Sequence, residues 1–585
     1  MNSLNLTTEQ IRTRLQEIYE SASAEEIATL CLSLQDIVDK FAASRSAKDQ
    51  GSLWSEKDVV LITYADQVSR DGQSALQTLN EFLTGEGVSQ SINTVHLLPF
   101  YPYSSDDGFS VIDYYDLAPG VGSWEDVSRL NESVYLMFDL VLNHCSQHSA
   151  WFKGFLQGDP QYQNYFHVFS PEQAESSELQ EQLSQVTRPR SLPLLSEYET
   201  ANGPKWVWTT FSDDQVDLNF SHTDVLLEFI KILLFYIESG GRIIRMDAVA
   251  FLWKKIGTSC IHLQKTHEVI KLFRDILEYA APEVILLTET NVPHKENVSY
   301  FGEGYEAHMV YQFSLPPLIL DAFAHEDPAP LRKWLTDLEP SPSGTTFFNF
   351  GASHDGIGVR PLEGLLDPAR FDSLIGKVKE RGGLVSTRRQ PDGTDTPYEL
   401  NISYLNAIVG DDSLDAETQV RKFMASQSII LAMPGIPGIY FHSLVGTPND
   451  HDGVNASGIP RRINRRKYEL DELTDCIHNN PVQQGIFASY LKLIQIRTLS
   501  SAFHPDGEFR GWDTTRCQHL GHEKLFVIER QSPDEQEKVL TIVNPTCESV
   551  TLNLDTPGWD LLTETTLTGS AVLPAFDFRW IRFSP

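Results

Sequence analysis

The sequence predicts an α/β protein built on a (β/α)8 barrel of the TIM type. Eight short runs rich in apolar and β-branched residues recur along the chain, with helical stretches between them. Each run is nearly continuous in apolar residues and is bounded by turns, which is typical of parallel strands that are buried on both faces. Eight such strands alternating with helices are the number that closes a barrel.

The chain begins with a helical extension, expected over residues 1–56. Apolar residues recur there at helical spacing, around Ile11 and again from Ile27 to Val38, which predicts two amphipathic helices. The catalytic barrel is expected over residues 57–504. Its strands are predicted at VVLITYA (59–65), NTVHLLPF (93–100), VYLMFDLVLNH (134–144), GRIIRMDAV (241–249), VILLTET (284–290), MVYQFSLP (309–316), TTFFNFGASHD (345–355) and GIPGIYFHSL (435–444).

Two intervals between these runs are too long for one helix, and insertions in this fold sit in the loops that follow the strands. Residues 145–240, after the third run, are predicted to hold an inserted subdomain, and residues 356–412 form a second insertion after the seventh run. From residue 505 the pattern changes to strand-like pieces such as KLFVIER and FRWIRF without helices between them. We therefore expect a small all-β domain over residues 505–585.

The charge balance excludes two classes of partner. The chain has 46 Lys and Arg against 80 Asp and Glu, a net charge of −34. A field of this sign repels phosphate backbones and anionic lipid headgroups, so neither nucleic acid nor a membrane is expected as a partner. The chain starts with the polar segment MNSLNLTTEQ and has no long apolar run, which predicts a cytoplasmic protein. No pattern indicates an oligomeric state.

Three carboxylates stand where catalytic groups lie in barrel enzymes. Asp247, Glu289 and Asp355 each end an apolar run, where a buried charge is costly. A single carboxylate at such a place is more often a helix cap or part of a loop salt bridge. Three of them, together with Arg245 and His354, favour glycoside cleavage. Retaining enzymes of this kind need a carboxylate nucleophile and a carboxylic acid about 5 Å apart, and a neighbouring arginine keeps the nucleophile ionised.

The segments around these residues resemble a known family. RIIRMDAV, ILLTET, FGASHDG and DLVLNH are similar to the four signature segments of the α-amylase superfamily, glycoside hydrolase family 13, and the resemblance covers roughly residues 57–585. It implies that Asp247 is the nucleophile, Glu289 the general acid/base and Asp355 the stabiliser of the transition state. The residues that it implies hold the glucosyl unit are His144, Arg245 and His354.

Longer segments resemble the sucrose phosphorylase subfamily. These are ITYAD (62–66), HLLPFYPYSSDDGFSVIDY (96–114), RPR (188–190), WTTFSDDQVDLN (208–219) and SHDGIGV (353–359). The resemblance implies that Asp106 and Arg465 grip the hydroxyls of one glucose, and that Phe109 and Phe211 line its site. It also implies double displacement, in which phosphate attacks a β-glucosyl enzyme to give α-glucose 1-phosphate without metal or cofactor.

The leaving group is recognised in loops where the chain departs from sucrose phosphorylases. Phe251 replaces a tyrosine after the nucleophile, and Thr290-Asn291 follow the acid/base in place of Val-His. The second insertion contains GGLVSTRRQPDGTDTPYELN. Adjacent arginines are usually a solvated pair, but in so acidic a protein they could attract an anionic acceptor, because the arginine fork suits carboxylate or phosphate. The acceptor residues predicted there are Arg388, Arg389 and Gln390.

The acceptor with the best match is D-glycerate. Residues 288–312 and the helical extension are most similar to glucosylglycerate phosphorylases, which implies 2-O-α-D-glucosyl-D-glycerate as the donor. Sucrose 6′-phosphate phosphorylase, which also has an anionic acceptor, is the second reading. Sucrose phosphorylase and glucosylglycerol phosphorylase follow, since neither needs a cation in this loop. A hydrolase or transglucosidase would use the same carboxylates. A non-catalytic binding scaffold is disfavoured because all three carboxylates are present.

A basic run near residue 465 and the possible metal ligands remain to be interpreted. The basic run between residues 461 and 467 is interpreted as one sugar-binding arginine, Arg465, with solvated neighbours. The 17 histidines show no HExxH or similar spacing, and the acidic loops DDGF and NDHDG could bind Ca²⁺ only if carbonyls and waters completed its set of oxygen ligands. No metal is therefore expected.

Overall fold

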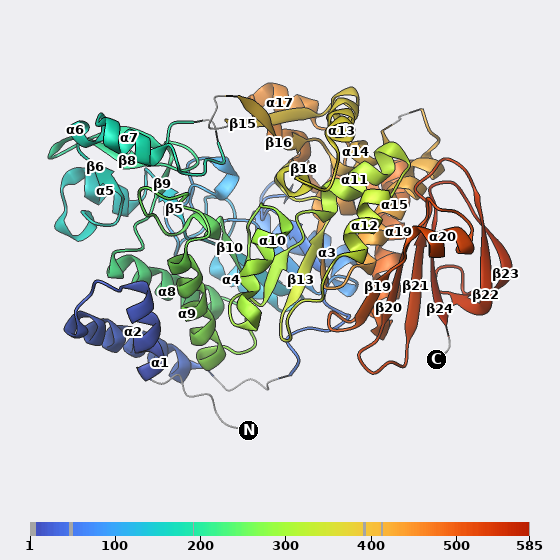
Figure 1. Ribbon diagram of the computed structural model, residues 1–585, viewed down its shortest axis with the longest axis horizontal. Helices are drawn as coiled ribbons and strands as arrows, with labels where there is room; N and C mark the ends of the chain where they lie inside the picture. Colours follow the sequence, from blue (N-terminus) through green and yellow to red (C-terminus); the bar gives the residue numbers. More distant parts are fainter. Residues whose placement is uncertain (1–7, 46–50, 191, 390–393, 411–412, 584–585) are drawn as a thin grey trace.

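A computed structural model describes residues 8–45, 51–190, 192–389, 394–410 and 413–583 (Figure 1). Its centre is a closed barrel of parallel strands, and each strand is hydrogen-bonded to the next one along the chain until the last returns to the first. All eight predicted runs form these strands, so the predicted barrel is confirmed. They are β1 (Val60–Thr63), β3 (Thr94–Leu97), β4 (Tyr135–Val141), β10 (Gly241–Asp247), β11 (Ile285–Thr288), β12 (Met309–Tyr311), β13 (Thr346–Phe350) and β17 (Ile436–Tyr440).

Amphipathic helices surround the barrel and bury their apolar faces against it. The larger helices of this layer are α3 (Ala75–Gly85), α4 (Trp124–Asn131), α8 (Thr223–Glu238), α9 (Gln264–Ala280), α11 (Leu315–His325), α12 (Ala329–Thr336), α15 (Ala416–Ala432), α18 (Leu470–Asn479) and α19 (Pro481–Thr498). Within the part of the chain that the structure describes, no helix has the length and apolar character needed to cross a bilayer.

The N-terminal periodicity corresponds to two helices, α1 (Thr8–Ile18) and α2 (Ala24–Ser44). Helix α2 begins at a capping box, in which the Ser23 hydroxyl accepts from the Glu26 amide and the Glu26 carboxylate accepts from the Ser23 amide. Both helices pack on α9, and α2 also contacts α8. The extension therefore covers two barrel helices on the outside of the fold (Figure 1).

Residues after the third barrel strand form small sheets. The order β6-β8-β7 makes one sheet, a separate pair is formed by β5 and β9, and α8 closes the segment by packing on β10. Figure 1 shows this insertion projecting to one side. Its elements are β5 (His144–Ser146), α5 (Ala150–Gln157), β6 (Val168–Phe169), α6 (Pro171–Ala174), α7 (Ser177–Leu183), β7 (Leu195–Thr200), β8 (Gly203–Trp208) and β9 (Gln215–Asp217).

Residues after the seventh strand form a three-stranded antiparallel sheet in the order β14-β16-β15. Strand β15 carries the two predicted arginines near its end. The elements of this insertion are β14 (Ile357–Gly358), α13 (Pro368–Glu380), β15 (Leu384–Arg389), β16 (Asp395–Asn401) and α14 (Tyr404–Val409). Predicted site residue Gln390 lies outside the described residues, as does the side chain of Arg389.

The chain ends in an antiparallel sheet with the order β19-β20-β21-β24-β22-β23, so the predicted all-β domain is confirmed. Its elements are β19 (Glu508–Gly511), α20 (Thr514–Leu520), β20 (Phe526–Gln531), β21 (Lys538–Val543), β22 (Val550–Asp560), β23 (Thr565–Leu573) and β24 (Phe578–Phe583). We propose residues 1–56, 57–504 and 505–585 as the three structural units of the chain.

A buried arginine joins the terminal sheet to the barrel. Arg530 on β20 is fully buried and donates to the backbone carbonyls of Ala432 and Met433, which follow α15 into the last barrel strand. It also donates to the carbonyls of His504 and Glu508. One buried side chain thus donates to four backbone carbonyls that come from the barrel and from the terminal sheet.

Replacing Arg530 should separate this interface. We expect Arg530→Met to lower the free energy of unfolding by about 3 kcal/mol, because buried carbonyls lose their donor. Denaturant unfolding measures this change. Arg510→Met, at an exposed position on β19, is the matched control and should be nearly neutral. Equal stabilities of the two variants would contradict the proposed role of Arg530.

Candidate active site

The predicted catalytic carboxylates meet at the C-terminal rim of the barrel. Asp247 ends β10 and Glu289 directly follows β11. The register pairs Met246 with Thr288, so the next residues on the two neighbouring strands are Asp247 and Glu289. Asp355 reaches the same rim from the loop after β13. The barrel geometry therefore brings together three residues that are far apart in the sequence.

Arg245 compensates the charge of Asp247. Side chains two residues apart on a strand point to the same face, and the Arg245 guanidinium lies 2.8 Å from Asp247 Oδ1. It also forms an ion pair with buried Asp139, its register partner on β4, and donates to the Tyr311 hydroxyl at 3.2 Å. Burial raises the pKa of Asp247, Arg245 opposes this rise, and the nearby Glu289 charge adds to it.

Glu289 has fewer partners. Its Oε2 accepts from the Ala248 amide at 3.0 Å, and Ala248 adopts a left-handed φ of 49° immediately after Asp247. Burial raises the pKa of Glu289. Arg245 opposes this rise for Glu289 as well, but its direct contact is with Asp247, so the two carboxyl groups form a coupled pair in unequal surroundings. Such a pair has the arrangement that general acid and nucleophile chemistry requires.

Asp355 is more accessible than Asp247, with 29% of its side chain exposed against 11%. Its Oδ1 lies 2.6 Å from Arg461, 3.5 Å from His354 and 3.8 Å from Arg465. Burial opposes ionisation, but the charge of Arg461 above all, with further contributions from Arg465 and Arg245, holds the pKa of Asp355 below its ordinary value. Asp355 is therefore a permanent carboxylate that faces the site.

Aromatic and imidazole rings form the wall beside these carboxylates. The Phe109 and His354 rings stack at a centroid distance of 4.7 Å and an angle of 7°. His144 Nε2 lies 2.9 Å from the Phe109 carbonyl, and the His144 ring is in tilted contact with Phe211. Burial lowers the pKa of both histidines, which keeps them neutral. Neutral rings can donate to and accept from sugar hydroxyls without adding charge.

The turn that carries Asp106 is unusual. Asp106 and Asp107 both have left-handed φ angles, 51° and 49°. Arg465 lies 2.6 Å from Asp107, and Arg462 also pairs with Asp107. Asp106 lies farther from Arg465, at 3.9 Å. The resemblance pairs Asp106 with Arg465, and the structure adds Asp107 as the residue that directly neutralises this arginine.

The interpretation of the basic run is wrong for Arg461, which is not solvated. Only 15% of its side chain is exposed, and it pairs with Asp355 and with Glu399, the latter at 3.0 Å. Five cations occur within seven residues of the sequence, and no periodicity indicates which of them turn inward, because the segment is a short 3-10 helix and its flanks. Only its tertiary partners identify Arg461, and they are carboxylates from distant segments: Asp355 in the loop after β13 and Glu399 on β16.

A cavity of about 70 Å³ opens beside Glu289. The residues at which the chain departs from sucrose phosphorylases, Phe251, Thr290 and Asn291, line this cavity. Phe251 contacts Phe211 edge to face across this cavity. The lining includes Phe211, Phe251, Asn291, Tyr398, Arg188, Arg360 and Arg388.

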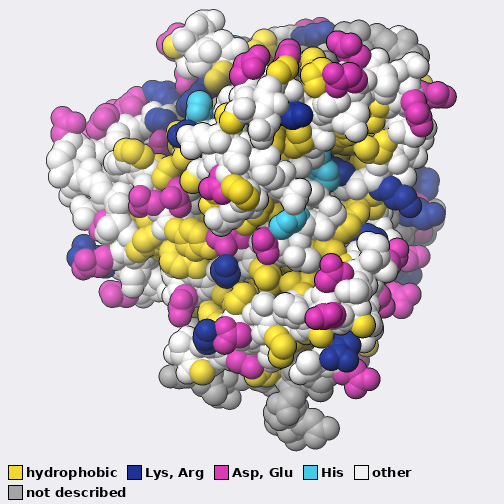
Figure 2. Space-filling view, turned by 90° about the vertical axis from the view of Figure 1, so that its left-hand side faces the viewer, with side chains coloured by type: hydrophobic (Ala, Val, Ile, Leu, Met, Phe, Trp, Pro, Cys, Tyr) yellow, Lys and Arg dark blue, Asp and Glu magenta, His cyan; other side chains and the backbone are white. Residues whose placement is uncertain are grey.

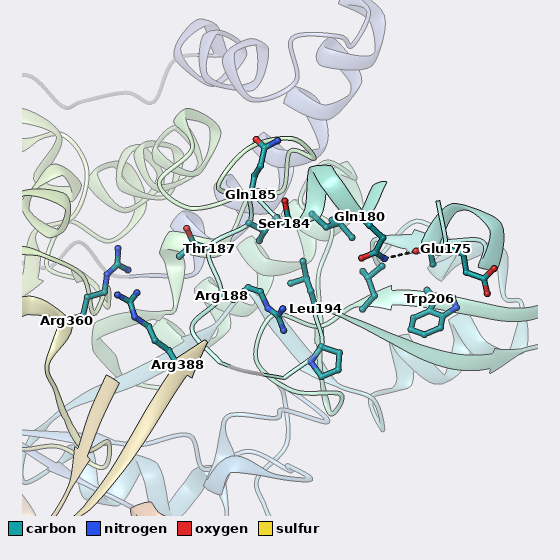
Figure 3. Close-up of a pocket in the computed structure, with 15 residues that line it drawn as sticks. Glu175, Gln180, Ser184, Gln185, Thr187, Arg188, Leu194, Trp206, Arg360 and Arg388 are labelled. Carbon is teal, nitrogen blue, oxygen red and sulfur yellow. Dashed lines mark hydrogen bonds between the residues drawn. The ribbon is translucent and has the colours of Figure 1, made fainter. Parts of the chain in front are cut away.

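This inner cavity adjoins a larger one of about 1070 Å³ against the first insertion. Both are lined by Arg188, Arg360 and Arg388, which Figure 3 shows between the second insertion and the first. Arg388 pairs with Glu363 at 2.9 Å, and Arg360 lies 3.5 Å from Glu296. The sequence predicted Arg388 alone of these three. For Arg188 the sequence offered one indication, the RPR motif that contains it. Arg360 is an isolated arginine, and no sequence pattern marks it as a site residue.

Among the described residues, no group of three or more His, Cys, Asp or Glu side chains is arranged to hold a metal ion. The carboxylates at the rim pair with arginines instead. The arrangement can therefore perform glucosyl transfer by carboxylate chemistry: a nucleophile, an acid and a fixed negative charge surround one neutral, ring-lined pocket, and an arginine-lined cavity lies beside the acid.

Comparison with known proteins agrees with this geometry. A family model described as the alpha amylase catalytic domain matches residues 89–335. The solved structure of sucrose 6F-phosphate phosphorylase from Thermoanaerobacter thermosaccharolyticum is similar, with a TM-score of 0.73 at 25% identity over 91% of this chain and 100% of that chain. The alpha-amylase from H. orenii has the same fold, with a TM-score of 0.62 at 15% identity over 90% of this chain and 100% of its own.

Curated relatives are more similar still. A glucosylglycerate phosphorylase from Spirochaeta thermophila is 50% identical over 491 residues, 83% of this chain and 80% of that protein. A glucosylglycerate phosphorylase from Escherichia coli is 46% identical over 459 residues, 78% of this chain and 80% of that protein. The chain therefore belongs to the family of these glucosylglycerate phosphorylases, within the α-amylase-type barrel enzymes.

Proposed function

We propose that this chain is a retaining phosphorylase that transfers glucose from 2-O-α-D-glucosyl-D-glycerate to inorganic phosphate. The products are α-D-glucose 1-phosphate and D-glycerate. The observation that carries the proposal is the arginine-lined cavity beside Glu289, because the leaving group must depart on the side of the general acid. The identity to glucosylglycerate phosphorylases over most of the chain supports the same acceptor.

The first step forms a covalent glucosyl enzyme. Asp247 attacks the anomeric carbon while Glu289 gives its proton to the glycosidic oxygen, which breaks the bond and releases D-glycerate. Asp355 stabilises the transition state through its negative charge and by accepting hydrogen bonds from hydroxyls of the glucosyl unit. Residues proposed to hold the glucosyl unit are Asp106, Phe109, His144, Phe211, Arg245, His354 and Arg465.

The second step reverses the geometry. Phosphate enters the cavity that D-glycerate has left. An oxygen of the phosphate attacks the anomeric carbon and breaks its bond to Asp247, while Glu289 accepts the proton of the attacking phosphate. Both molecules are anions, so one arginine cluster serves both half-reactions. Figure 2 shows acidic side chains spread over the face on that side of the molecule, and the net charge is −34. A local cation cluster is therefore needed to hold an anion there.

Sucrose 6-phosphate phosphorolysis is the second candidate. The outer cavity of about 1070 Å³ shares the three arginines and is large enough for an acceptor bigger than glycerate. A sucrose 6(F)-phosphate phosphorylase is 29% identical over 77% of this chain, well below the glucosylglycerate phosphorylases. The acceptor preference separates the two proposals.

The first functional test varies the acceptor. The protein is incubated with α-glucose 1-phosphate and, separately, with D-glycerate, fructose 6-phosphate, fructose, glycerol or water, and released phosphate is measured. We expect the fastest release with D-glycerate, since its carboxylate pairs with an arginine fork. Preference for fructose 6-phosphate would replace the proposed acceptor with the second candidate.

The arginine cluster is tested in the same assay. Arg388→Gln should raise the KM for D-glycerate by about tenfold or more, because one charge-assisted contact is lost. Hydrolysis of α-D-glucosyl fluoride, a neutral donor, should change little, because neither this donor nor water needs the anion contact. Arg129→Gln, at a half-exposed position on α4, is the matched control. Equal effects of Arg388→Gln on both reactions would contradict acceptor binding.

The catalytic roles are tested with α-D-glucosyl fluoride, whose leaving group needs little protonation. Asp247→Asn should abolish fluoride release, whereas Glu289→Gln should retain much of the first step and lose about 10² to 10⁴-fold with D-glycerate as the leaving group. The pKa of Glu289 is raised, so its proton is present below that pKa and is lost as the pH rises through it.

The wild type should therefore lose kcat/KM for glucosylglycerate on the alkaline side, and fluoride release by Glu289→Gln should lack this alkaline limb. Circular dichroism checks that each variant is folded. Substantial turnover by Asp247→Asn, or an unchanged alkaline limb in Glu289→Gln, would refute the assignment of the respective residue.

A further inference from the structure

Glu399 lies at the junction between the second insertion and the rim of the barrel. It is on β16, and only 2% of the residue is exposed. Its Oε1 accepts from the Gly356 amide at 2.5 Å, and Gly356 directly follows Asp355. The same carboxylate receives the Arg461 guanidinium in a two-point contact, with nitrogen to oxygen distances of 3.0 Å and 3.2 Å.

Glu399 thus contacts both groups that locate the Asp355 carboxylate. Arg461 holds Asp355 Oδ1 at 2.6 Å, and the Gly356 amide fixes the backbone on the following side. Asp355 needs such contacts because it lies in an irregular loop, outside any strand. Its own backbone has two more hydrogen bonds: its carbonyl accepts from Asn464 at 3.0 Å, and its amide donates to the Ser353 hydroxyl at 3.2 Å.

The close approach of Glu399 depends on a glycine. A Cβ atom at position 356 would lie 2.6 Å from Glu399 Cγ and 2.7 Å from the Leu400 carbonyl oxygen, so any other residue would displace the strand. Strand β14 then continues from Gly356 and pairs with β16 through Ile357 and Leu400. The contact between Glu399 and the Asp355 loop is therefore built into the backbone.

The same strands carry the acceptor side of the site. Tyr398 precedes Glu399 and lines the cavity beside Glu289. Strand β15 pairs with β16, with Ser386 opposite Glu399, and Arg388 lies two residues farther along β15 in the same cavity. One small sheet therefore lines the proposed acceptor cavity through Tyr398 and Arg388, and it also contacts the Asp355 loop through Glu399.

We propose that Glu399 and Arg461 are positioning residues that fix Asp355 from the acceptor-side sheet. This inference rests on the proposed glucosyl transfer. Arg461 contributes the ion pair, Glu399 orients Arg461 and holds the Gly356 amide, and the two act as one unit. Because Asp355 serves both half-reactions, the unit affects glucosyl transfer to every acceptor by the same factor, rather than the binding of any one acceptor.

The test compares Glu399→Gln, Arg461→Lys and the double variant with wild type. Release of fluoride from α-D-glucosyl fluoride without acceptor reports the carboxylate chemistry at the rim, including Asp355, and the D-glycerate assay adds the acceptor side. We expect both single variants to lose kcat about tenfold or more in the two assays by the same factor, since small displacements of a reacting group are costly. The KM for D-glycerate should stay within about twofold.

The double variant distinguishes a unit from two independent effects. If Arg461 acts through its orientation by Glu399, the double variant should lose no more than the worse single variant. Additive losses would overturn the proposal. So would unchanged fluoride release combined with a raised KM for D-glycerate, because that result would place Glu399 in acceptor binding.

Thermal unfolding accompanies each assay, and Arg461→Lys carries the test if Glu399→Gln does not fold. Glu125→Gln, which removes an exposed carboxylate from α4, is the matched control and should match wild type in every readout. If the wild type releases fluoride but does not use D-glycerate as an acceptor, the proposed acceptor is wrong. The proposed role of Glu399 would still be tested by the rate of fluoride release.

Discussion

Mutual repulsion of carboxylates buried at one rim is the constraint on which the site depends. Asp139, Asp247, Glu289 and Asp355 converge there, and their charges are costly away from water unless cations pair with them. Arginines from separate segments supply the compensation. Arg245 comes from a barrel strand, whereas the others come from a loop after the last strand, namely Arg461, Arg462 and Arg465.

The uneven distribution of these cations gives chemically similar groups different surroundings. Asp247 and Asp355 each contact an arginine, whereas Glu289 accepts from a backbone amide. In the proposed mechanism this difference leaves the proton on Glu289. The two proposed sides of the site differ in the same way: neutral rings line the proposed glucose position, and three arginines line the cavity proposed for the leaving group. Glucose has no charge, whereas D-glycerate and phosphate are both anions.

The two insertions line the cavity beside Glu289, which is the proposed acceptor site. The barrel strands place the carboxylates, but the cavity beside Glu289 is closed by the first insertion, which carries Arg188, and by the second, which carries Arg388 and Tyr398. The inserted sheet also contacts Asp355 through Glu399. Loops that recognise the acceptor can therefore vary while the chemistry at the rim is kept, which is the usual division in this fold.

The sequence by itself determined the barrel, its strand positions and the catalytic candidates, because buried parallel strands form continuous apolar runs and polar residues at their ends are conspicuous. It also indicated Arg388, through an unusual pair of arginines in an acidic chain. Only the tertiary structure decided which cations turn inward. Arg461 and Arg360 lie in segments without periodicity, and their positions depend on carboxylate partners distant in the sequence, the buried Glu399 and the partly exposed Glu296. Such pairings are set by packing between loops, and no local pattern encodes them.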